Sequence, residues 1–250
     1  MVRAPHPVLP RYYKDHDQRH PFVIELFDGA ASYYDRVCRL MSLGSGQWYR
    51  RWTLERLGLA PGMRVLDVAT GTALVARAAL DIVKEPAAVV GLDPSAGMLA
   101  EARKHFAGRL AQGRVEELPF ADARFDLLTI GYALRHAADL DVALGECLRV
   151  LKPGGRLLIL EISRPASTAQ RGLIRFHLTR VLPWAMRLCT RNRHAHLLMR
   201  YYWDTIVTCV PPETVLEALQ RTGFAEPRRT VLGGLLSEYT ALKPRPHGSA

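Results

Sequence analysis

The spacing of hydrophobic and polar positions changes at about residue 60. Residues 20 to 59 place apolar and aromatic side chains on recurring helical faces and end at Pro61-Gly62. Beyond that pair, short apolar runs alternate with helical patterns. The predicted strands are 64–68, 88–92, 114–116, 125–130, 156–162, 230–232 and 235–242. The predicted helices are 72–83, 95–106, 139–151 and 213–221, with a helical insertion at 165–203.

This alternation predicts the fold class. Strands that alternate with helices form a parallel sheet with right-handed crossovers, so we expect an α/β fold with a doubly wound, mostly parallel, seven-stranded, Rossmann-like sheet. Gly233-Gly234 joins the last two runs as a hairpin and predicts an antiparallel edge. Lys152-Pro153-Gly154-Gly155 predicts the end of a helix and a turn into the next strand. The tails before about residue 20 and after Lys243 are expected to be disordered.

Composition narrows the class of protein. A chain of 250 residues with 48% hydrophobic content suits one globular domain. No apolar run approaches the ~20 residues of a membrane span, and the N-terminus lacks the apolar segment of a secretory signal, so a cytoplasmic protein is expected. The four cysteines lack CxxC spacing, which favours reduced thiols over disulfides or zinc. No metal site is predicted.

The net charge of +10 is distributed unevenly. The segment from 171 to 200 holds seven arginines and no acidic residue, interleaved with apolar side chains. This mixture suits an amphipathic helix on anionic lipid, and equally a solvated helix face. No nucleic-acid-reading module accompanies it, so nucleic acid is not an expected partner. The arginines are Arg171, Arg175, Arg180, Arg187, Arg191, Arg193 and Arg200.

The stretch VLDVATGTALVA, residues 65 to 76, has the form of a ligand-binding turn. In doubly wound sheets the turn after the first strand lies at the carboxyl edge, where ligands bind. Asp67 ends the strand, and Gly71 lets the backbone approach a ligand. Ala69 and Thr72 keep the turn free of bulky side chains. A tight packing turn is the alternative explanation for Gly71 taken alone.

A second carboxylate indicates the kind of ligand. Asp93 ends the next strand, 22 residues after Gly71, where it can accept hydrogen bonds from ribose hydroxyls. A dinucleotide fingerprint would need glycines at 69, 71 and 74, but the chain has Ala69 and Leu74. The pattern therefore predicts an adenosine cofactor that is not a dinucleotide.

Five linked motifs carry a family resemblance. They are YDRVCRLMSLGSGQWYRR (34–51), VLDVATGTA (65–73), GLDPSAGML (91–99), EELPFADARFDLLTIGYALRHAADLDVAL (116–144) and LRVLKPGGRLLILEISRP (148–165). On these motifs, from about Phe27 to Lys243, the chain resembles the S-adenosylmethionine-dependent class I methyltransferases. Within them it is similar to the ubiquinone/menaquinone C-methyltransferase family, the UbiE/MenG type.

The resemblance implies S-adenosyl-L-methionine as cofactor. The Thr72 loop would face its methionine part, Asp93 its ribose and Met98 its adenine. Arg114-Val115 replaces the family's Asn-Ala pair, and Arg114 cannot accept a hydrogen bond from the adenine amino group, so the backbone of Val115 would carry more of the recognition. The implied contacts are Asp67, Ala69, Gly71, Thr72, Asp93, Met98, Arg114, Val115 and Gly131.

The implied reaction is methylation of a carbon of a hydroquinone-like ring with a lipophilic tail. Such a ring reacts once a hydroxyl ionises. We predict that Arg135 stabilises the resulting oxyanion and that His136, where the family has asparagine, accepts the proton. The alternative is that His136 caps the loop and points to solvent. Glu161 is expected to pair with an arginine.

The same motifs divide the chain into predicted parts. One methyltransferase domain would cover 1–250, with a helical lid at 20–59, a cofactor-binding core at 60–163, a helical insertion at 164–208 and a C-terminal helix and hairpin at 209–243. The insertion could then rest on the inner face of an anionic membrane and admit an insoluble tail.

Departures from the family pattern leave other functions open. Gly46 stands where the family usually has histidine, and Cys209-Val210 replaces an aromatic or histidine followed by proline. A methyltransferase acting on oxygen or carbon of a soluble aromatic or polyketide metabolite is one alternative. A non-catalytic scaffold is another, since Ala69 and Ala73 stand where glycine is common. The sequence leaves the oligomeric state open.

Overall fold

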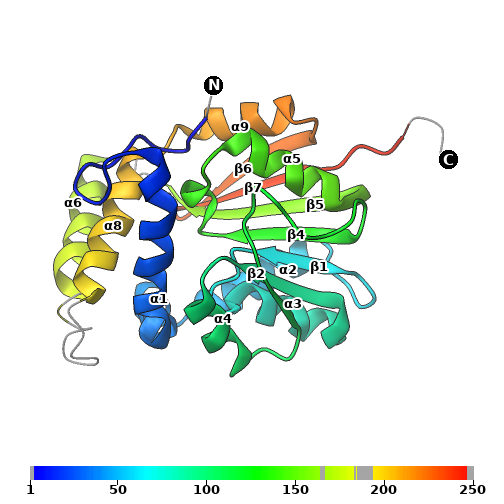
Figure 1. The fold of residues 1–250 in the computed structure, drawn as a ribbon, viewed down its shortest axis with the longest axis horizontal. Helices are drawn as coiled ribbons and strands as arrows, with labels where there is room; N and C mark the ends of the chain where they lie inside the picture. The colour runs from blue at the N-terminus through cyan, green and yellow to red at the C-terminus, as the bar shows by residue number, and fades with distance from the viewer. Residues whose placement is uncertain (1–2, 164–166, 183, 185–193, 247–250) are drawn as a thin grey trace.

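The computed structural model describes residues 3–163, 167–182, 184 and 194–246. A seven-stranded sheet in the order β3-β2-β1-β4-β5-β7-β6 forms its centre (Figure 1). The strands are β1 (Val65–Val68), β2 (Val89–Asp93), β3 (Arg109–Gln112), β4 (Phe125–Gly131), β5 (Leu151–Ile162), β6 (Ala225–Leu232) and β7 (Leu236–Leu242). The helices are α1 (His16–Met41), α2 (Gly46–Arg56), α3 (Leu74–Val83), α4 (Ala96–Arg103), α5 (Leu140–Val150), α6 (Thr168–Phe176), α8 (His194–Thr208) and α9 (Pro212–Arg221).

The first five strands confirm the predicted parallel sheet. β1 pairs in parallel with β2 and β4, β2 with β3, and β4 with β5. Helices cover both faces, with α5 and α9 on one side and α2 and α3 on the other (Figure 1). Because each face is covered, all four side chains of β1 are buried. The strand order reverses at β1 and β4, which places a switch point at their carboxyl ends.

The far side of the sheet is antiparallel, as predicted. β7 pairs antiparallel with both β5 and β6. The turn between β6 and β7 contains Gly233 and Gly234 with φ of 59° and 69°, a left-handed conformation that glycine adopts without strain. The glycine pair therefore forms the hairpin that the sequence indicates.

Two predicted boundaries are wrong. The strand expected at 114–116 is a loop with one isolated bridge, and the true strand is β3. β3 is a half-exposed edge strand, so it lacks the apolar run that marks a buried strand. Residues 152–155 do not separate a helix from a later strand, because β5 already begins at Leu151. The pairing register shifts there, which makes the Pro-Gly-Gly segment an irregularity inside the strand.

The prediction of a disordered N-terminal tail is also wrong. The Leu140 backbone N–H donates to the Arg3 carbonyl at 3.0 Å, and the Val210 N–H donates to the Pro5 carbonyl at 2.7 Å. His6 and Tyr13 are buried, so burial of aromatic surface holds this polar segment in place. α1 begins at His16, where the Asp15 carboxylate caps the helix by accepting from the Gln18 N–H.

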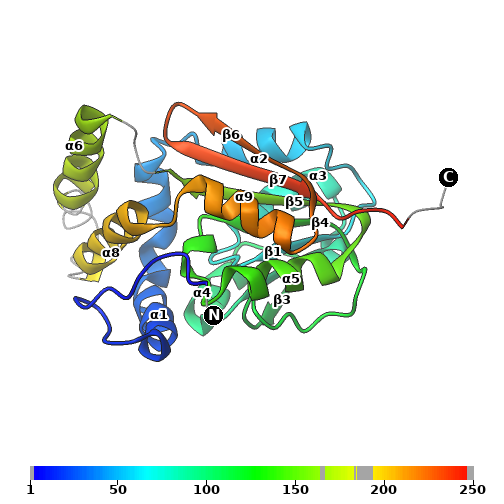
Figure 2. The same ribbon diagram turned by 90° about the horizontal axis from the view of Figure 1, so that it is seen from above.

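The helical insertion lies beside α1 and away from the sheet (Figure 2). It comprises α6, a π-helical turn at His177–Val181, and α8. No side chain of α6 is buried, and Leu173 and Phe176 are 69% and 60% exposed. Arg187, Arg191 and Arg193 of the predicted basic segment lie outside the described residues. Within the described ranges, no helix is long and apolar enough to cross a bilayer.

Candidate active site

A cavity opens where β1, β2 and β4 end, beneath α1. Its empty volume is about 780 Å³, counting the part open to solvent, which suits a small-molecule site. We call it the cofactor cavity. Predicted site residues that line it are Ala69, Gly71, Asp93, Met98, Arg114, Val115, Gly131 and His136. Asp67, Thr72 and Arg135 do not line it.

Asp67 fixes the turn after β1 by hydrogen bonds, without lining the cavity itself. Its carboxylate accepts from the Thr70 and Thr129 hydroxyls at 2.6 Å each and from the Ala76 N–H at 3.1 Å. Burial raises the pKa of this carboxyl to about 6, although the three donors oppose the shift. Asp67 thus joins β1, β4 and the start of α3 at the turn.

The turn exposes its backbone to the cavity. Ala69, Gly71 and Ala73 all have left-handed φ angles, of 54°, 56° and 66°. A Cβ added at Gly71 would meet nothing within 4 Å, so the backbone there faces open space. Across the cavity, a Cβ at Gly131 would lie 2.8 Å from the Val75 side chain, which leaves no room for a larger residue. A ligand can therefore approach the backbone closely at Gly71, whereas Gly131 is required by its packing against Val75.

Asp93 joins the turns after β1 and β2. Its carboxylate accepts from the Gly71 N–H and from the Ser95 N–H, each at 2.8 Å. A carboxylate offers about four acceptor positions, so acceptors remain for ribose hydroxyls. Burial raises the pKa of Asp93 to about 6, against the effect of the two N–H donors. With the open backbone at Gly71 and the apolar Met98, this arrangement fits the nucleoside of S-adenosylmethionine.

Helix α1 is attached to both turns. Asp28 accepts from the Gly97 N–H at 2.8 Å and from the Ser95 hydroxyl. Asp35 accepts from Arg77 at 2.8 Å and from the Thr72 hydroxyl. Our sequence interpretation missed this function of Asp28 and Asp35. Their spacing of seven residues, which places both on one helix face, is the signal that could have indicated it.

Aromatic side chains form the other end of the cofactor cavity. Phe27, Tyr34, Tyr132 and Tyr202 line it. The hydroxyls of Tyr34 and Tyr202 are hydrogen-bonded at 2.6 Å, and Phe27 meets the Tyr202 ring edge-on, with centroids 6.2 Å apart. Such walls suit a flat aromatic molecule.

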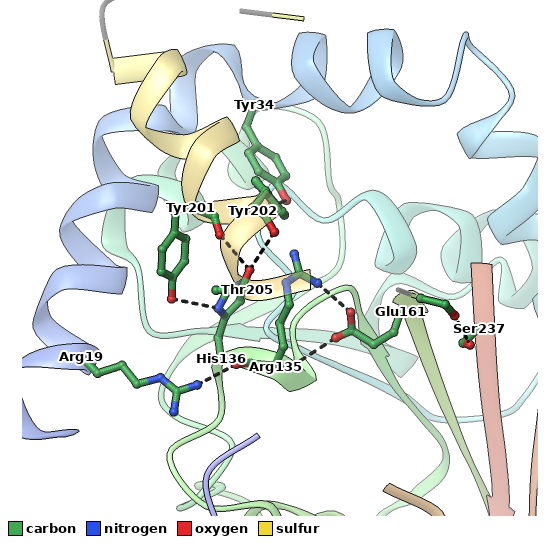
Figure 3. Close-up of polar contacts among 10 residues, drawn as sticks. Arg19, Tyr34, Arg135, His136, Glu161, Tyr201, Tyr202, Thr205 and Ser237 are labelled. Carbon is green, nitrogen blue, oxygen red and sulfur yellow. Dashed lines mark hydrogen bonds and ion pairs between the residues drawn. The ribbon is translucent and has the colours of Figure 1, made fainter. Parts of the chain in front are cut away.

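Arg135 lies beside the pair formed by Tyr34 and Tyr202 (Figure 3). It is 1% exposed, its Nη1 donates to Glu161 at 2.7 Å, and its guanidinium lies 4.9 Å from the centre of the Tyr202 ring. The pairing expected for Glu161 is confirmed. Burial lowers the pKa of Arg135, but Glu161, Tyr202 and Tyr34 together raise it by more, so the side chain stays charged. Its Nε and Nη2 are buried without a partner in the described structure.

His136 is held as a neutral ring. It stacks on Tyr201 with centroids 5.5 Å apart, and its Nδ1 lies 3.4 Å from the Tyr201 hydroxyl. Its Nε2 is buried and has no partner among the described residues, so the ring does not point to solvent. Burial, followed by the charges of Arg135 and Arg19, lowers its pKa well below 6.5.

A second buried cation, Arg19, contacts the loop that carries Arg135 and His136. Arg19 Nη2 donates to the Arg135 carbonyl at 2.6 Å and to His6 Nε2 at 3.0 Å. Burial and the charge of Arg19 lower the pKa of His6 to about 4. Sequence reasoning missed both residues, because 116 positions separate Arg19 from Arg135 and no local pattern connects them.

The remaining titratable groups form no metal centre in the part of the chain that the structure describes. No group of three or more His, Cys, Asp or Glu side chains there could hold a metal ion. Cys38, Cys147 and Cys209 are free thiols, and Cys189 lies outside the described residues.

Known proteins match most of the chain. The model of the ubiE/COQ5 methyltransferase family matches residues 13–243. A demethylmenaquinone methyltransferase of Mycobacterium marinum is 35% identical over 90% of this chain and 94% of that relative. One of Mycobacterium tuberculosis is 35% identical over 89% of this chain and 92% of its own length.

Solved structures match the fold. A methyltransferase from Thermotoga maritima, described as a possible histamine N-methyltransferase, aligns with a TM-score of 0.61 at 18% identity, over 88% of this chain and 98% of that one. The [4+2]-cyclase SpnF aligns with a TM-score of 0.64 at 18% identity, over 97% of this chain and 100% of that one. At this identity the likeness concerns the fold alone. From the family model and the relatives, the chain belongs to the ubiE/COQ5 methyltransferase family and is an S-adenosylmethionine-dependent methyltransferase.

Proposed function

We propose that this enzyme methylates a ring carbon of a hydroquinone-like acceptor that carries a lipophilic tail. The names of the relatives, demethylmenaquinone methyltransferases, support this class of acceptor. The observation that carries the proposal is Arg135, a buried cation behind the aromatic end of the cofactor cavity, whose Nε and Nη2 have no partner among the described residues.

The cofactor would lie along the three strand ends. Asp93 would accept from its ribose hydroxyls, Met98 and Val115 would contact its adenine, and the backbone at Gly71 would pass its methionine part. Bound S-adenosylmethionine supplies an electrophilic methyl group on a positively charged sulfur. The aromatic wall then excludes water from the side where the acceptor must approach.

The main energetic cost of the reaction is ionisation of the acceptor hydroxyl, and Arg135 would stabilise the ionised form. A phenol-like hydroxyl with a pKa of ~10 costs roughly 4 kcal/mol to ionise at pH 7. A preorganised donor at a developing oxyanion contributes about 2.7–4 kcal/mol. Since the two magnitudes match, one buried guanidinium is enough to make the ionised ring accessible.

His136 is placed to remove the proton. Its unpartnered Nε2 can accept from the acceptor hydroxyl, and its neutral form predominates at pH 7 because its pKa is lowered. The same low pKa means that the imidazolium is short-lived beside Arg135 and Arg19. His136 therefore acts as a relay that passes the proton to water.

The function is tested with a panel of acceptors and isotopically labelled methyl donor. Demethylmenaquinols of increasing tail length and small soluble phenols are incubated with the enzyme, and products are read by mass spectrometry. We expect methyl transfer to a ring carbon of the tailed quinols. Transfer only to small phenols, or to oxygen, would contradict the proposal. Failure to bind S-adenosylhomocysteine in calorimetry would leave only the scaffold.

Replacing His136 with Asn, the family's residue, tests the relay. We expect kcat to fall by about 10- to 100-fold, because asparagine accepts a hydrogen bond but not a proton. At saturating S-adenosylmethionine, the wild-type pH profile of kcat should show no step near pH 6.5 from His136, since its pKa lies well below that value. Equal kcat for both proteins across a pH series would show that His136 is not the relay.

We further propose that α6 rests on an anionic membrane. Leu173 and Phe176 are exposed apolar side chains, and the segment from Arg171 to Arg200 carries no acidic residue. An interfacial helix with such a composition gains free energy from apolar insertion and from attraction to anionic headgroups. Its position would bring a membrane-bound acceptor to the enzyme.

Vesicle sedimentation measures this docking. We expect binding to phosphatidylglycerol vesicles, weakened by salt and weak on pure phosphatidylcholine. Replacing Leu173 and Phe176 together with serine should weaken binding at least about tenfold, because each loses roughly 1.5–3 kcal/mol of apolar burial. Val231→Ser, at an exposed apolar position on β6, is the matched control. Binding that ignores charge, salt and both α6 substitutions would refute the docking.

A further inference from the structure

A second cavity lies on the other side of Arg135. It opens at the carboxyl end of β5, between the end of α8 and the start of α9, with an empty volume of about 1050 Å³ including its open part. None of its lining residues lines the cofactor cavity. Nothing in the reaction as described so far uses it.

The walls of the second cavity combine apolar surface with positive charge. Its charged lining consists of Arg135, Arg171, Arg229 and a single carboxylate, Glu161, which already pairs with Arg135. Such a cavity favours an anion with an apolar body. The apolar lining includes Leu134, Ile162, Ile206, Val210, Val215 and Tyr239.

Arg135 gives the second cavity a specific donor. Its Nε and Nη2 are buried without partners in the described structure, and an unsatisfied buried donor costs about 1–3 kcal/mol. A ligand oxygen in the cavity would recover that free energy. Arg229 adds a donor at the rim, where its Nε already donates to the Ser237 hydroxyl at 2.8 Å.

Tyr202 forms the wall between the two cavities. Its ring lines the cofactor cavity, while the guanidinium 4.9 Å from the centre of that ring lines the second cavity. Its hydroxyl is hydrogen-bonded to Tyr34, an interaction with a net contribution of about 1 kcal/mol. The two cavities therefore come close to each other at Tyr202 and Arg135.

The second cavity also reaches the insertion. Arg171, one of its lining residues, lies on α6, the helix that presents Leu173 and Phe176 to solvent. A lipophilic tail leaving the cavity beside Arg171 would meet this apolar surface directly.

We propose that the second cavity is the binding site of the acceptor: an aromatic ring whose ionised oxygen contacts Arg135 and whose lipophilic tail leaves past α6. This deepens the proposed function and rests on its acceptor class. Movement of the Tyr202 ring then brings the acceptor into contact with the cofactor and with His136, which lines the cofactor cavity and not the second cavity.

Binding of stable anionic probes tests the site. 2-Hydroxy-1,4-naphthoquinone is anionic at neutral pH and resembles the ionised ring, and its 3-prenyl derivative adds a tail. Cys209→Trp and Val210→Trp fill the cavity from partly exposed positions, and Val231→Trp on β6 is the matched control. In calorimetry, we expect the first two variants to weaken both probes at least about tenfold. S-adenosylhomocysteine affinity should stay within about twofold, and the control should match the wild type.

Two results would overturn the site: probe affinity unchanged in both filling variants, or probe displaced by saturating S-adenosylhomocysteine, which would place it in the cofactor cavity. Arg229→Gln covers the case in which a filling variant is unstable. It should weaken the 2-hydroxy probe severalfold but not the neutral 2-methyl-3-prenyl-1,4-naphthoquinone, and equal effects on both would count against the site. Probe binding without turnover of any quinol would refute the proposed function and leave the site standing.

Discussion

Replacing Arg135 with methionine is expected to lower kcat at least about 100-fold while S-adenosylhomocysteine affinity changes less than about threefold. Arg135 is the buried cation behind the aromatic end of the cofactor cavity, and loss of one oxyanion donor typically costs 10²–10³ in kcat. The cofactor contacts lie on other strands, so binding should survive. Stopped-flow or discontinuous turnover assays and calorimetry measure the two quantities separately.

The same substitution should destabilise the protein, because it leaves Glu161 buried without its partner, a loss of about 3 kcal/mol. The double variant Arg135→Met/Glu161→Gln removes the unpaired charge. It should recover most of the stability and none of the activity, which separates the chemical role from the structural one. If kcat returns with stability, Arg135 serves the fold and not the reaction.

Replacing Asp93 with alanine is expected to weaken S-adenosylhomocysteine binding about 100-fold. The carboxylate would lose its hydrogen bonds to ribose, and the Gly71 and Ser95 N–H groups would lose the acceptor that fixes both turns. Hydrogen bonds to a charged group contribute ~1.5–3 kcal/mol each, which gives the expected magnitude. Asp126→Asn, at a surface carboxylate that pairs with Lys152, is the control. An unchanged dissociation constant for Asp93→Ala would place the nucleoside elsewhere.

In the wild-type enzyme, the affinity for S-adenosylhomocysteine should depend on the charge of Asp93 and therefore on pH. With its pKa at about 6, Asp93 is increasingly protonated below pH 6, and affinity should fall by up to about tenfold per pH unit there. In Asp93→Ala this pH dependence should disappear.

The stability of the protein must be measured at each pH together with ligand binding, because some buried groups stabilise the fold as pH falls and others destabilise it. The raised pKa values of Asp67 and Asp93 add stability as pH falls from about 6 towards their unfolded values. The lowered pKa values of His6, His20 and His136 remove stability as pH falls below 6.5. Circular dichroism at each pH distinguishes loss of ligand binding from unfolding.

The sequence predicted well wherever a property is local. Asp67 and Gly71 predict the turn after β1, and two adjacent glycines predict the β6–β7 hairpin. The pairing of Glu161 with an arginine could be anticipated because Glu161 lies at the end of a strand, although the sequence did not identify Arg135 as the partner.

The failures share a different cause. β3 was not predicted because an edge strand needs no apolar run. The support of Arg135 by Arg19 and His6 was not predicted because it depends on contacts between distant parts of the chain. The second cavity was invisible for the same reason, since its walls come from β5, α6, α8, α9 and the N-terminal segment.

The packed N-terminal segment has a consequence for synthesis of the enzyme. Pro5 is translated some 200 positions before its hydrogen-bond partner, Val210. Until Val210 has been translated, His6 cannot pack against the folded domain. During synthesis the segment around Pro5 therefore stays unpacked, and the contacts behind Arg135 are completed only after Val210 has been translated.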